Sequence, residues 1–318
     1  MKALAIVGAT ASGKTALSIE MARRFDCEII CCDSMQIYKH MDIGTAKATV
    51  EERSQAKHHL LDFLSPDVSY SAADYSIDAY KVASDITERN KTPLFCGGTG
   101  LYLEAARTAR HSESPQSDEK YRHYLNDIAK TEGGVDTLYE MLCRCDAESA
   151  LTIHKNNVKR VIRALEIFHV SGIPKSEWDA RTKNAPPQID MLTFCITYRD
   201  REILYRRIDE RVDEMIRQGL AEETRFLLER GYLDEKTTAS QAIGYKEYAQ
   251  FLRGEISEEQ AIENIKLATR HYAKRQLTWF SSKESIIPLY ADDGERLATP
   301  AELCDRISEQ VLNFVNNS

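Results

Sequence analysis

The sequence lacks an excess of basic charge, a membrane-length apolar run, a low-complexity segment and an internal repeat. Its 42 Lys and Arg residues are outnumbered by 50 Asp and Glu residues, which gives a formal net charge of −8 over 318 residues. Any contact with nucleic acid must therefore come from local basic patches. No secretory leader precedes the first apolar segment, so we expect a cytoplasmic protein without membrane contact.

A metal-binding arrangement of cysteine and histidine is also missing. Among eight cysteines, Cys143-Arg-Cys145 has neither a second pair nor nearby histidines, and Cys31 and Cys32 end an apolar run. The adjacent His58 and His59 have no third ligand close by, so we expect hydrogen-bonding structural histidines. Reduced thiols in a cytosolic enzyme are the simplest account.

One stretch near the N-terminus carries a specific signal. Gly8-Ala-Thr-Ala-Ser-Gly-Lys-Thr15 follows the apolar run 3–7 and precedes helical apolar spacing over 16–22. This is the G-x-x-x-x-G-K-T pattern of a phosphate-binding loop between a strand and a helix, rather than a chance tight turn. We expect a bound diphosphate or triphosphate, with Mg²⁺ held by the Thr15 hydroxyl. The predicted phosphate ligands are Gly8, Ala9, Thr10, Ala11, Ser12, Gly13, Lys14 and Thr15.

The apolar patterns predict an α/β fold with an inserted helical module. Strands are expected at 3–7, 28–32, 93–96, 191–197 and 285–290, separated by helical patterns that favour a parallel sheet. Residues from about 113 to 184 have helical spacing without a convincing strand. We therefore predict a first part of the α/β core over 1–112, a helical domain over 113–188, and a second part of the core over 189–318.

Two polar segments follow predicted strands, where the ligands of open α/β sheets bind. Asp33 follows the strand at 28–32, and is a candidate Mg²⁺ ligand through water or a general base; a helix cap is the alternative. Thr99 lies in Gly97-Gly-Thr-Gly100 after the strand at 93–96. Its hydroxyl would lie beside the phosphate loop, unless it merely caps a helix.

Basic side chains gather on three predicted helices. Arg206, Arg207 and Arg211 share the helix 201–218, and Lys155, Lys159, Arg160 and Arg163 surround the start of the helix 158–170. The last long helix carries Lys266, Arg270, Lys274 and Arg275 with aromatic residues between them, and no acidic residue occurs from 265 to 283. Such a stripe suits a nucleic-acid backbone, although basic faces are often only solvated.

Together these stretches closely resemble the bacterial tRNA dimethylallyltransferase (tRNA isopentenyltransferase) family. The resemblance spans roughly residues 1–285 in the family's order. The matching segments are Gly8–Thr15, Asp33–Tyr38, Asp42–Lys47, Tyr70–Ala73, Gly97–Tyr102, Arg160–Glu166, Ile243–Glu247 and Tyr272–Gln276 with Thr278-Trp279. It implies a P-loop kinase-like parallel core with an inserted all-helical domain, the two together gripping the tRNA anticodon stem-loop.

The resemblance also implies a reaction. The dimethylallyl group of dimethylallyl diphosphate would pass to N6 of the adenosine that is 3′-adjacent to the anticodon, in tRNAs reading codons that begin with U. Mg²⁺ would be the cofactor, no ATP would be consumed, and a monomer would suffice for one stem-loop. The chemistry is consistent with this, because diphosphate leaves readily only when its charge is neutralised, and a stacked base must be flipped out first.

Roles are implied residue by residue. Asp33 matches the family's general base, Thr99 contacts the substrates, and Lys14 and Arg211 neutralise the leaving diphosphate. Contact with tRNA is implied for Asp33, Ser34, Met35, Gln36, Thr99, Arg122, Arg160 and Arg163, and the basic helices add Lys159, Lys274 and Arg275 as expected tRNA contacts. This sequence departs from the family pattern at Ala48, where proline is usual, and at Lys155, which could add a phosphate contact.

Other functions fit less of the sequence. A P-loop small-molecule kinase shares the phosphate loop and Asp33 but explains neither the basic helix nor Gly97–Tyr102. An RNA-binding NTP switch would need a guanine-recognition N-K-x-D segment, which is absent. An enzyme that prenylates free adenine nucleotides would have no use for an extended cationic surface.

Overall fold

A computed structural model describes residues 1–108, 118–183, 187–234, 237–294 and 296–316 of the chain. The chain divides into two compact units, of which the first comprises residues 1–109 and 188–318 and the second residues 110–187. Part of the polar segment 111–118, interpreted from the sequence as a linker, lies outside the described residues.

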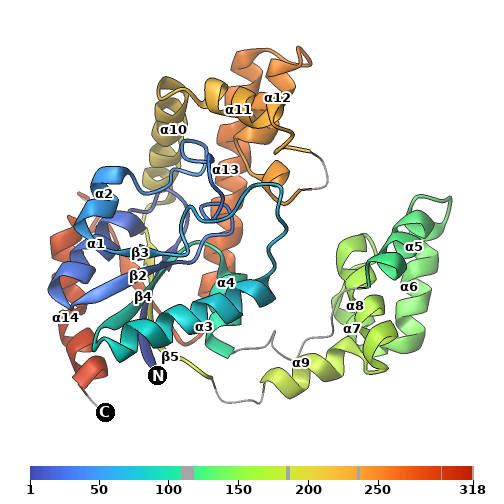
Figure 1. Cartoon of the computed structure of the whole chain (residues 1–318), viewed down its shortest axis with the longest axis horizontal. Coiled ribbons are helices and arrows are strands. Elements are labelled where there is room, and N and C mark those ends of the chain that lie inside the picture. Colours follow the sequence, from blue (N-terminus) through green and yellow to red (C-terminus); the bar gives the residue numbers. More distant parts are fainter. Residues whose placement is uncertain (109–117, 184–186, 235–236, 295, 317–318) are drawn as a thin grey trace. The chain divides into compact units, whose positions relative to one another are not determined.

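The first unit is built on a sheet in which the six described strands are all parallel, as predicted. Its spatial order is β3-β2-β4-β1-β5-β6, so β1, which leads into the phosphate loop, lies between β4 and β5 (Figure 1). The strands are β1 Lys2–Gly8, β2 Cys27–Cys31, β3 His58–His59, β4 Thr92–Gly97, β5 Asp190–Thr197 and β6 Ile286–Tyr290. Only the two-residue edge strand β3 was not expected from the sequence.

Helices cover both faces of this sheet, which explains why its strands are continuous apolar runs instead of alternating ones. On one face, Leu4, Ile6 and Phe194 pack with residues of α1 (Lys14–Arg24), α10 (Arg201–Arg217) and α14 (Pro300–Asn316). On the other face, side chains of β1 and β4 pack with α3 (Ala72–Glu88) and α4 (Gly100–Thr108).

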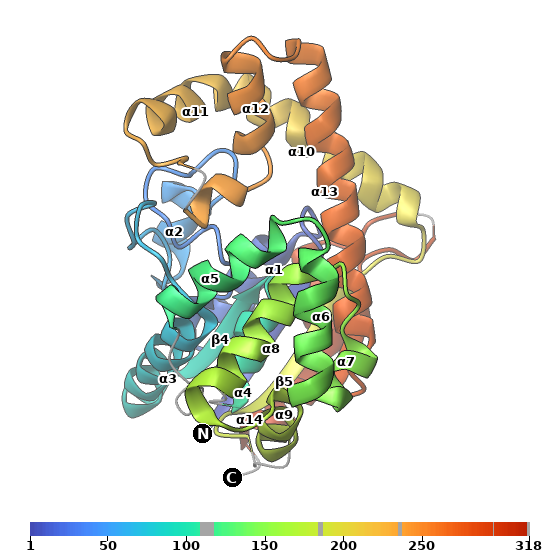
Figure 2. The same ribbon diagram turned by 90° about the vertical axis from the view of Figure 1, so that its right-hand side faces the viewer.

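A second apolar core lies among α10, α11 (Leu220–Glu229), α12 (Tyr245–Leu252) and α13 (Glu258–Ser281). Ile37, Tyr38 and Met41 enter this core, so it anchors the segment that follows β2. Figure 2 shows α13 running from α12 to the level of the sheet. Helix α13 therefore links this core to the cores on both faces of the sheet, which it enters through Ala273 and Phe280.

The short elements of this unit complete the surroundings of the sheet. Helix α2 spans Val50–Gln55, and a 3₁₀ helix spans Ala239–Gln241. Ser257 caps α13 by accepting the Gln260 N–H at 3.2 Å, but the Gln260 amide bonds Asn264, so the capping box that the Ser-x-x-Gln spacing would allow is only half formed. Among the described residues, no helix has both the length and the apolar character needed to cross a membrane.

The second unit contains only helices among its described residues. Leu125, Leu138, Leu142 and Leu165 form its core, and α8 ends at Gly172, whose φ of 68° suits glycine. Its helices are α5 Glu119–Ala129, α6 Gly134–Cys145, α7 Ala147–Thr152, α8 Val158–Ser171 and α9 Lys175–Lys183.

Candidate active site

The phosphate loop connects β1 to α1 as the sequence predicts. Gly8 has φ of 148° and a Cβ there would lie 2.8 Å from the Ile196 carbonyl oxygen, so only glycine fits between β1 and β5. Gly13, with φ of 92°, directly precedes the first helical residue, Lys14. The Lys14 Nζ folds back to donate to the Ala9 carbonyl at 2.6 Å. The loop thus has the strand–turn–helix form that binds anions.

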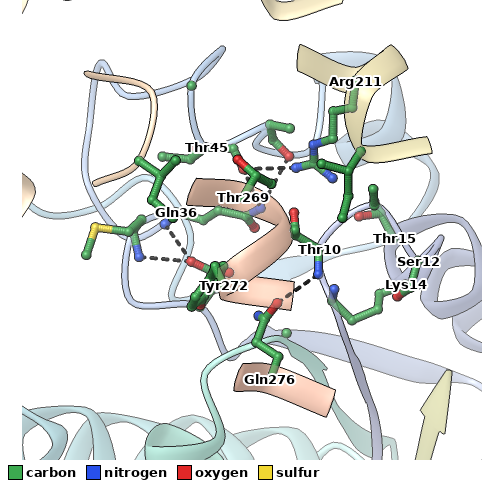
Figure 3. Close-up of a pocket in the computed structure, with 18 of the residues that line it drawn as sticks. Thr10, Ser12, Lys14, Thr15, Gln36, Thr45, Arg211, Thr269, Tyr272 and Gln276 are labelled. Atoms are coloured by element: carbon green, nitrogen blue, oxygen red, sulfur yellow. Dashed lines mark hydrogen bonds between the residues drawn. The ribbon is translucent and has the colours of Figure 1, made fainter. Parts of the chain in front are cut away.

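Side chains from distant elements hold this loop. Arg207 Nε donates to the Ala11 carbonyl at 2.9 Å, and the Tyr198 hydroxyl to the Ser12 carbonyl at 3.2 Å. The Thr10 N–H donates to Gln276 Oε1 at 2.9 Å, as Figure 3 shows. That N–H is among the predicted phosphate ligands, and in this structure Gln276 accepts it, while Thr10 still lines the cavity beside the loop.

A cavity of about 500 Å³ opens beside the loop. Its polar side carries Lys14, Arg207 and Arg211 together with the loop, and Asp33 also lines it. Its apolar side comes from α10, α13 and the segment before α12; the residues are Ile208, Val212, Met215, Ala242, Ile243 and Ile265. The sequence did not reveal this apolar side, because these residues have ordinary helical core spacing.

The cationic side of the cavity has unused hydrogen-bonding capacity. Arg211 donates to the Thr45 carbonyl at 3.3 Å, while its Nε and the Ser12 Oγ are buried and find no hydrogen-bond partner among the described residues. Burial lowers the pKa of Lys14, and Arg211 also lowers it; burial likewise lowers the pKa of Arg211. A bound anion would accept hydrogen bonds from the unpartnered donors. It would also offset the two neighbouring positive charges and so raise the lowered pKa values.

Asp33 and Thr99, at the ends of neighbouring strands, lie close together. The Asp33 Oδ1 accepts the N–H groups of Met35 and Gln36 at 2.9 and 3.4 Å in a turn, where a helix cap was the alternative. The Thr99 Oγ1 accepts the Ser34 N–H at 3.0 Å, so its side chain bonds the Asp33 segment and does not cap α4. In the described part of the chain no donor bonds the other Asp33 oxygen, Oδ2.

Tyr272 on α13 joins this group. It lines the cavity, and its hydroxyl lies near Thr99. Burial and, second, the Asp33 charge raise the pKa of Tyr272, so the hydroxyl keeps its proton. The sequence placed Tyr272 in a family motif but gave it no role.

In the segment after Asp33, one side chain holds a neighbouring loop and two line the cavity. Gln36 Nε2 donates to the Thr45 and Ala46 carbonyls at 3.1 and 3.2 Å, so its amide organises the neighbouring loop. Ser34 and Met35 are half-buried and line the cavity. In the segment 33–36, these two residues and the Asp33 Oδ2 remain open to a ligand.

The loop 42–47 is held by the helices beside it. The Glu223 carboxylate accepts the N–H groups of Asp42, Ile43 and Gly44 at 3.0 to 3.1 Å. Lys47 is buried and donates to Asp42, Asp62 and the Tyr38 carbonyl. This lysine, a cation that the sequence left without a role, is therefore structural.

The basic stripe on α13 divides into two parts. Lys266 pairs with Asp213 at 2.7 Å, and Arg270 with Asp209 at 2.9 Å, both acids being on α10. Lys274 and Arg275 are exposed, and in the described part of the chain neither has an acidic partner. Only the second part of the predicted stripe is open to a polyanion.

Within the second unit, some of the basic residues predicted to bind tRNA are paired with acids and others are exposed. Arg122 and Arg163 both bond the fully buried carboxylate of Glu166, at 2.9 and 2.7 Å. This pairing gives them a structural task, because a buried carboxylate needs neutralising. Lys159 and Arg160 are exposed, whereas Lys155, the candidate phosphate contact, pairs with Asp136.

The residues present fit a metal that is bound mainly through its substrate. Among the described residues, no group of three His, Cys, Asp or Glu side chains could hold an ion. Thr15, half-buried, lines the cavity beside the anion-binding loop. A hydroxyl plus diphosphate oxygens and water is the donor set that Mg²⁺ accepts.

Comparison with known proteins identifies the family. A family model described as IPP transferase matches residues 36–283, and one described as Isopentenyl transferase matches residues 1–66. The tRNA dimethylallyltransferase of Geobacillus thermodenitrificans is 46% identical over 302 residues, covering 95% of this chain and 94% of that one. That of Thermoanaerobacter sp. strain X514 is 44% identical over 289 residues, 91% of each chain.

Solved structures agree. The tRNA isopentenylpyrophosphate transferase of Bacillus halodurans has a TM-score of 0.71 and 38% identity, covering 99% of this chain and 98% of that one. A eukaryotic dimethylallyltransferase described as acting on tRNA has a TM-score of 0.82 and 30% identity, covering 99% of this chain and 80% of that one. The chain therefore belongs to the IPP transferase family.

Proposed function

We propose that this protein transfers the dimethylallyl group of dimethylallyl diphosphate to N6 of the adenosine 3′-adjacent to the anticodon, in tRNAs reading codons that begin with U. The observation that carries the proposal is one cavity lined by the phosphate loop, by Asp33 and by an apolar wall. Diphosphate, an amine to be deprotonated and a prenyl group each find matching chemistry there. Relatives named tRNA dimethylallyltransferase support the same reaction.

On the donor side, the loop and two cations take up the diphosphate. Lys14 and Arg211 neutralise the charge that develops as the C1–O bond of the donor breaks, and Ser12 Oγ and Arg211 Nε gain acceptors. Mg²⁺, held by Thr15 and the diphosphate oxygens, supplies further neutralisation when bound. The apolar wall from α10 and α13 receives the dimethylallyl group and excludes water.

On the acceptor side, Asp33 receives the proton that N6 loses as the new C1–N6 bond forms. Its Oδ1 is fixed by two backbone N–H groups, which leaves Oδ2 to face the amine. Thr99, locked against Ser34, offers its hydroxyl beside it. Orientation and proton acceptance are the two forms of assistance that a weakly nucleophilic amine needs.

We infer that tRNA binds through the exposed bases. Lys274 and Arg275 on α13, and Lys159 and Arg160 on α8, are available for phosphate contacts. Arg122 and Arg163 contribute charge from their places around Glu166. The kinase alternative is not favoured, because the named relatives are tRNA-modifying transferases and a kinase has no need of an apolar wall at this place.

The experiment incubates the purified protein with dimethylallyl diphosphate, Mg²⁺ and unmodified tRNA transcripts, followed by mass spectrometry of the nucleosides. We expect N6-dimethylallyladenosine in transcripts that have an adenosine 3′-adjacent to the anticodon and read codons beginning with U. A transcript with that adenosine replaced by guanosine is the matched control and should stay unmodified. Modification of the control, or of free AMP at a comparable rate, would contradict the assignment of the acceptor.

A further inference from the structure

The Gln276 side chain joins the phosphate loop to the turn that carries Thr99. Its Oε1 accepts the Thr10 N–H at 2.9 Å, and its Nε2 donates to the Gly98 carbonyl at 3.0 Å. The side chain is only 5% exposed, so these two bonds are shielded from water. One amide therefore spans the donor side and the acceptor side of the cavity (Figure 3).

The turn is shaped to admit this contact. A Cβ at Gly98 would lie 2.1 Å from Gln276 Nε2, and a Cβ at Gly100 would lie 2.3 Å from the Trp279 ring. Both partners, Gln276 and Trp279, belong to α13, so this helix packs against the turn through positions where only glycine leaves room. Thr99, between the two glycines, bonds the Asp33 segment through Ser34.

We propose that Gln276 is a positioning residue, which sets the distance between the diphosphate loop and the Asp33–Thr99 pair. The inference rests on the proposed transfer reaction. There the electrophilic carbon is placed by the loop and the amine by Asp33, so the length of the new bond depends on how these two parts are held. A shift of about 1 Å at such a site is expected to slow the reaction by about 10²-fold.

Substitution of Gln276 by Met removes both hydrogen bonds while keeping a similar length. With saturating donor and tRNA, we expect kcat to fall by about 10- to 100-fold. The Kd for tRNA should stay within about twofold, because the exposed bases are not altered, and the Tm should fall by only a few degrees, because the Thr10 N–H and the Gly98 carbonyl lose their partner. The control is Gln260→Met, an exposed position on the same helix, which should leave all three values unchanged.

Two outcomes would overturn the proposal. An unchanged kcat would show that the bridge does not position the reactants. A loss of kcat matched by equal losses of tRNA affinity and thermal stability would make Gln276 a merely structural residue. Should Gln276→Met fail to fold, Gln276→Glu gives the same comparison, because it keeps an acceptor for the Thr10 N–H but loses the donor to Gly98.

A double-mutant cycle tests the bridge from its other end. Gly98→Ala should displace the Gln276 amide and lower kcat about as much as Gln276→Ala does. In the Gln276→Ala background, where the end of the side chain is gone, Gly98→Ala should cost less than about threefold more. Multiplying losses would instead show that the two residues act independently and would overturn the proposal.

The inference can fail separately from the proposed function. Transfer by the wild type in the same assay establishes the reaction, and the variants then decide the role of Gln276. Without any wild-type transfer, the affinity for inorganic diphosphate, measured by calorimetry, decides instead. We expect it to be about tenfold weaker in Gln276→Met, because the loop is no longer held, and equal affinities would contradict the bridge.

Discussion

At the scale of single residues, the suitability of Asp33 as a general base depends on how the fold holds its carboxylate. Its carboxylate is half-buried in the cavity, with one oxygen held by the Met35 and Gln36 N–H groups. Those bonds orient the carboxylate without consuming both oxygens. A residue held in this way can accept a proton from a substrate without first reorganising.

Replacing Asp33 by Asn keeps the shape and removes the basic oxygen. We expect kcat to fall by about 10²- to 10⁴-fold, the usual contribution of a general base, while the Kd for tRNA stays nearly constant. Single-turnover rates and filter binding measure the two quantities. Comparable losses in rate and affinity would assign Asp33 to binding instead.

Glu28 at the start of β2 gives a prediction about pH. Its side chain is 6% exposed and contacts His59, Arg89 and Lys57 at 2.7, 2.7 and 3.2 Å. Burial by itself would raise the pKa of Glu28, but these hydrogen bonds outweigh burial and lower it to about 2. His59 hydrogen-bonds this carboxylate, and His58 hydrogen-bonds the Ala56 carbonyl. Both are hydrogen-bonding structural histidines, as predicted.

Because the folded pKa of Glu28 is depressed, its contribution to stability is present above the unfolded value near 4.5 and is lost as pH falls toward about 2. The shift corresponds to about 3 kcal/mol at neutral pH. Urea unfolding of the wild type and Glu28→Gln at pH 7 and pH 3 should show a difference in unfolding free energy that shrinks at pH 3. A difference that is constant across this range would contradict the ionic contribution.

Much of the candidate site was predictable from residue types, but its convergence was not. The phosphate loop, Asp33 and Thr99 are recognisable because each directly follows a predicted strand. Gln276, Tyr272 and the apolar wall reach the same cavity from helices far along the chain. Spacing within a helix shows which face is apolar, but not which cavity that face lines.

At the scale of elements, α13 has the most varied tasks. It carries Tyr272 and Gln276 toward the cavity, Phe280 into the core beside β4, and Lys274 and Arg275 to the surface. Its earlier bases, Lys266 and Arg270, are neutralised by α10. The basic side chains between 265 and 283 therefore serve two purposes. The earlier ones pair with acids of the neighbouring helix, and the later ones form an open cationic end.

Reversing that open end tests its role. With Lys274 and Arg275 both changed to Glu, tRNA binding should weaken, and the slope of log K against log salt should fall by about one for each phosphate that the variant no longer binds. Titrations over a range of salt concentrations measure the slope. The matched control reverses Arg23 and Lys81, exposed bases on α1 and α3, and should keep it. An unaltered slope in the α13 variant would rule out phosphate binding there.

Long helices were predicted well, and the helices that were missed are short. The expected helices at 158–170 and 201–218 agree with α8 and α10 to within one residue, because each has several turns of apolar spacing. Helices α2, α4, α9 and α12 were not predicted. Helix α4 begins at Gly100, within a glycine-rich turn, and α12 begins directly after Gly244. At both places the sequence favours a loop.

At the scale of the whole molecule, the fold explains why a phosphate loop can serve a transferase. The parallel sheet brings the ends of β1, β2 and β4 together, which places the loop, Asp33 and Thr99 at one edge. Helices α10 and α13, with the segment before α12, then close that edge with an apolar wall. In the proposed reaction a diphosphate held there would be the leaving group, and no nucleotide would be hydrolysed.

The most direct test of this account measures the diphosphate released for each dimethylallyl group transferred to tRNA, with ATP absent and with ATP in excess. The account predicts one diphosphate per modified tRNA, at a rate that does not depend on ATP. It also predicts that no ADP is formed. A requirement for ATP, or ATP turnover without transfer to tRNA, would contradict the assignment of the phosphate loop to a prenyl diphosphate.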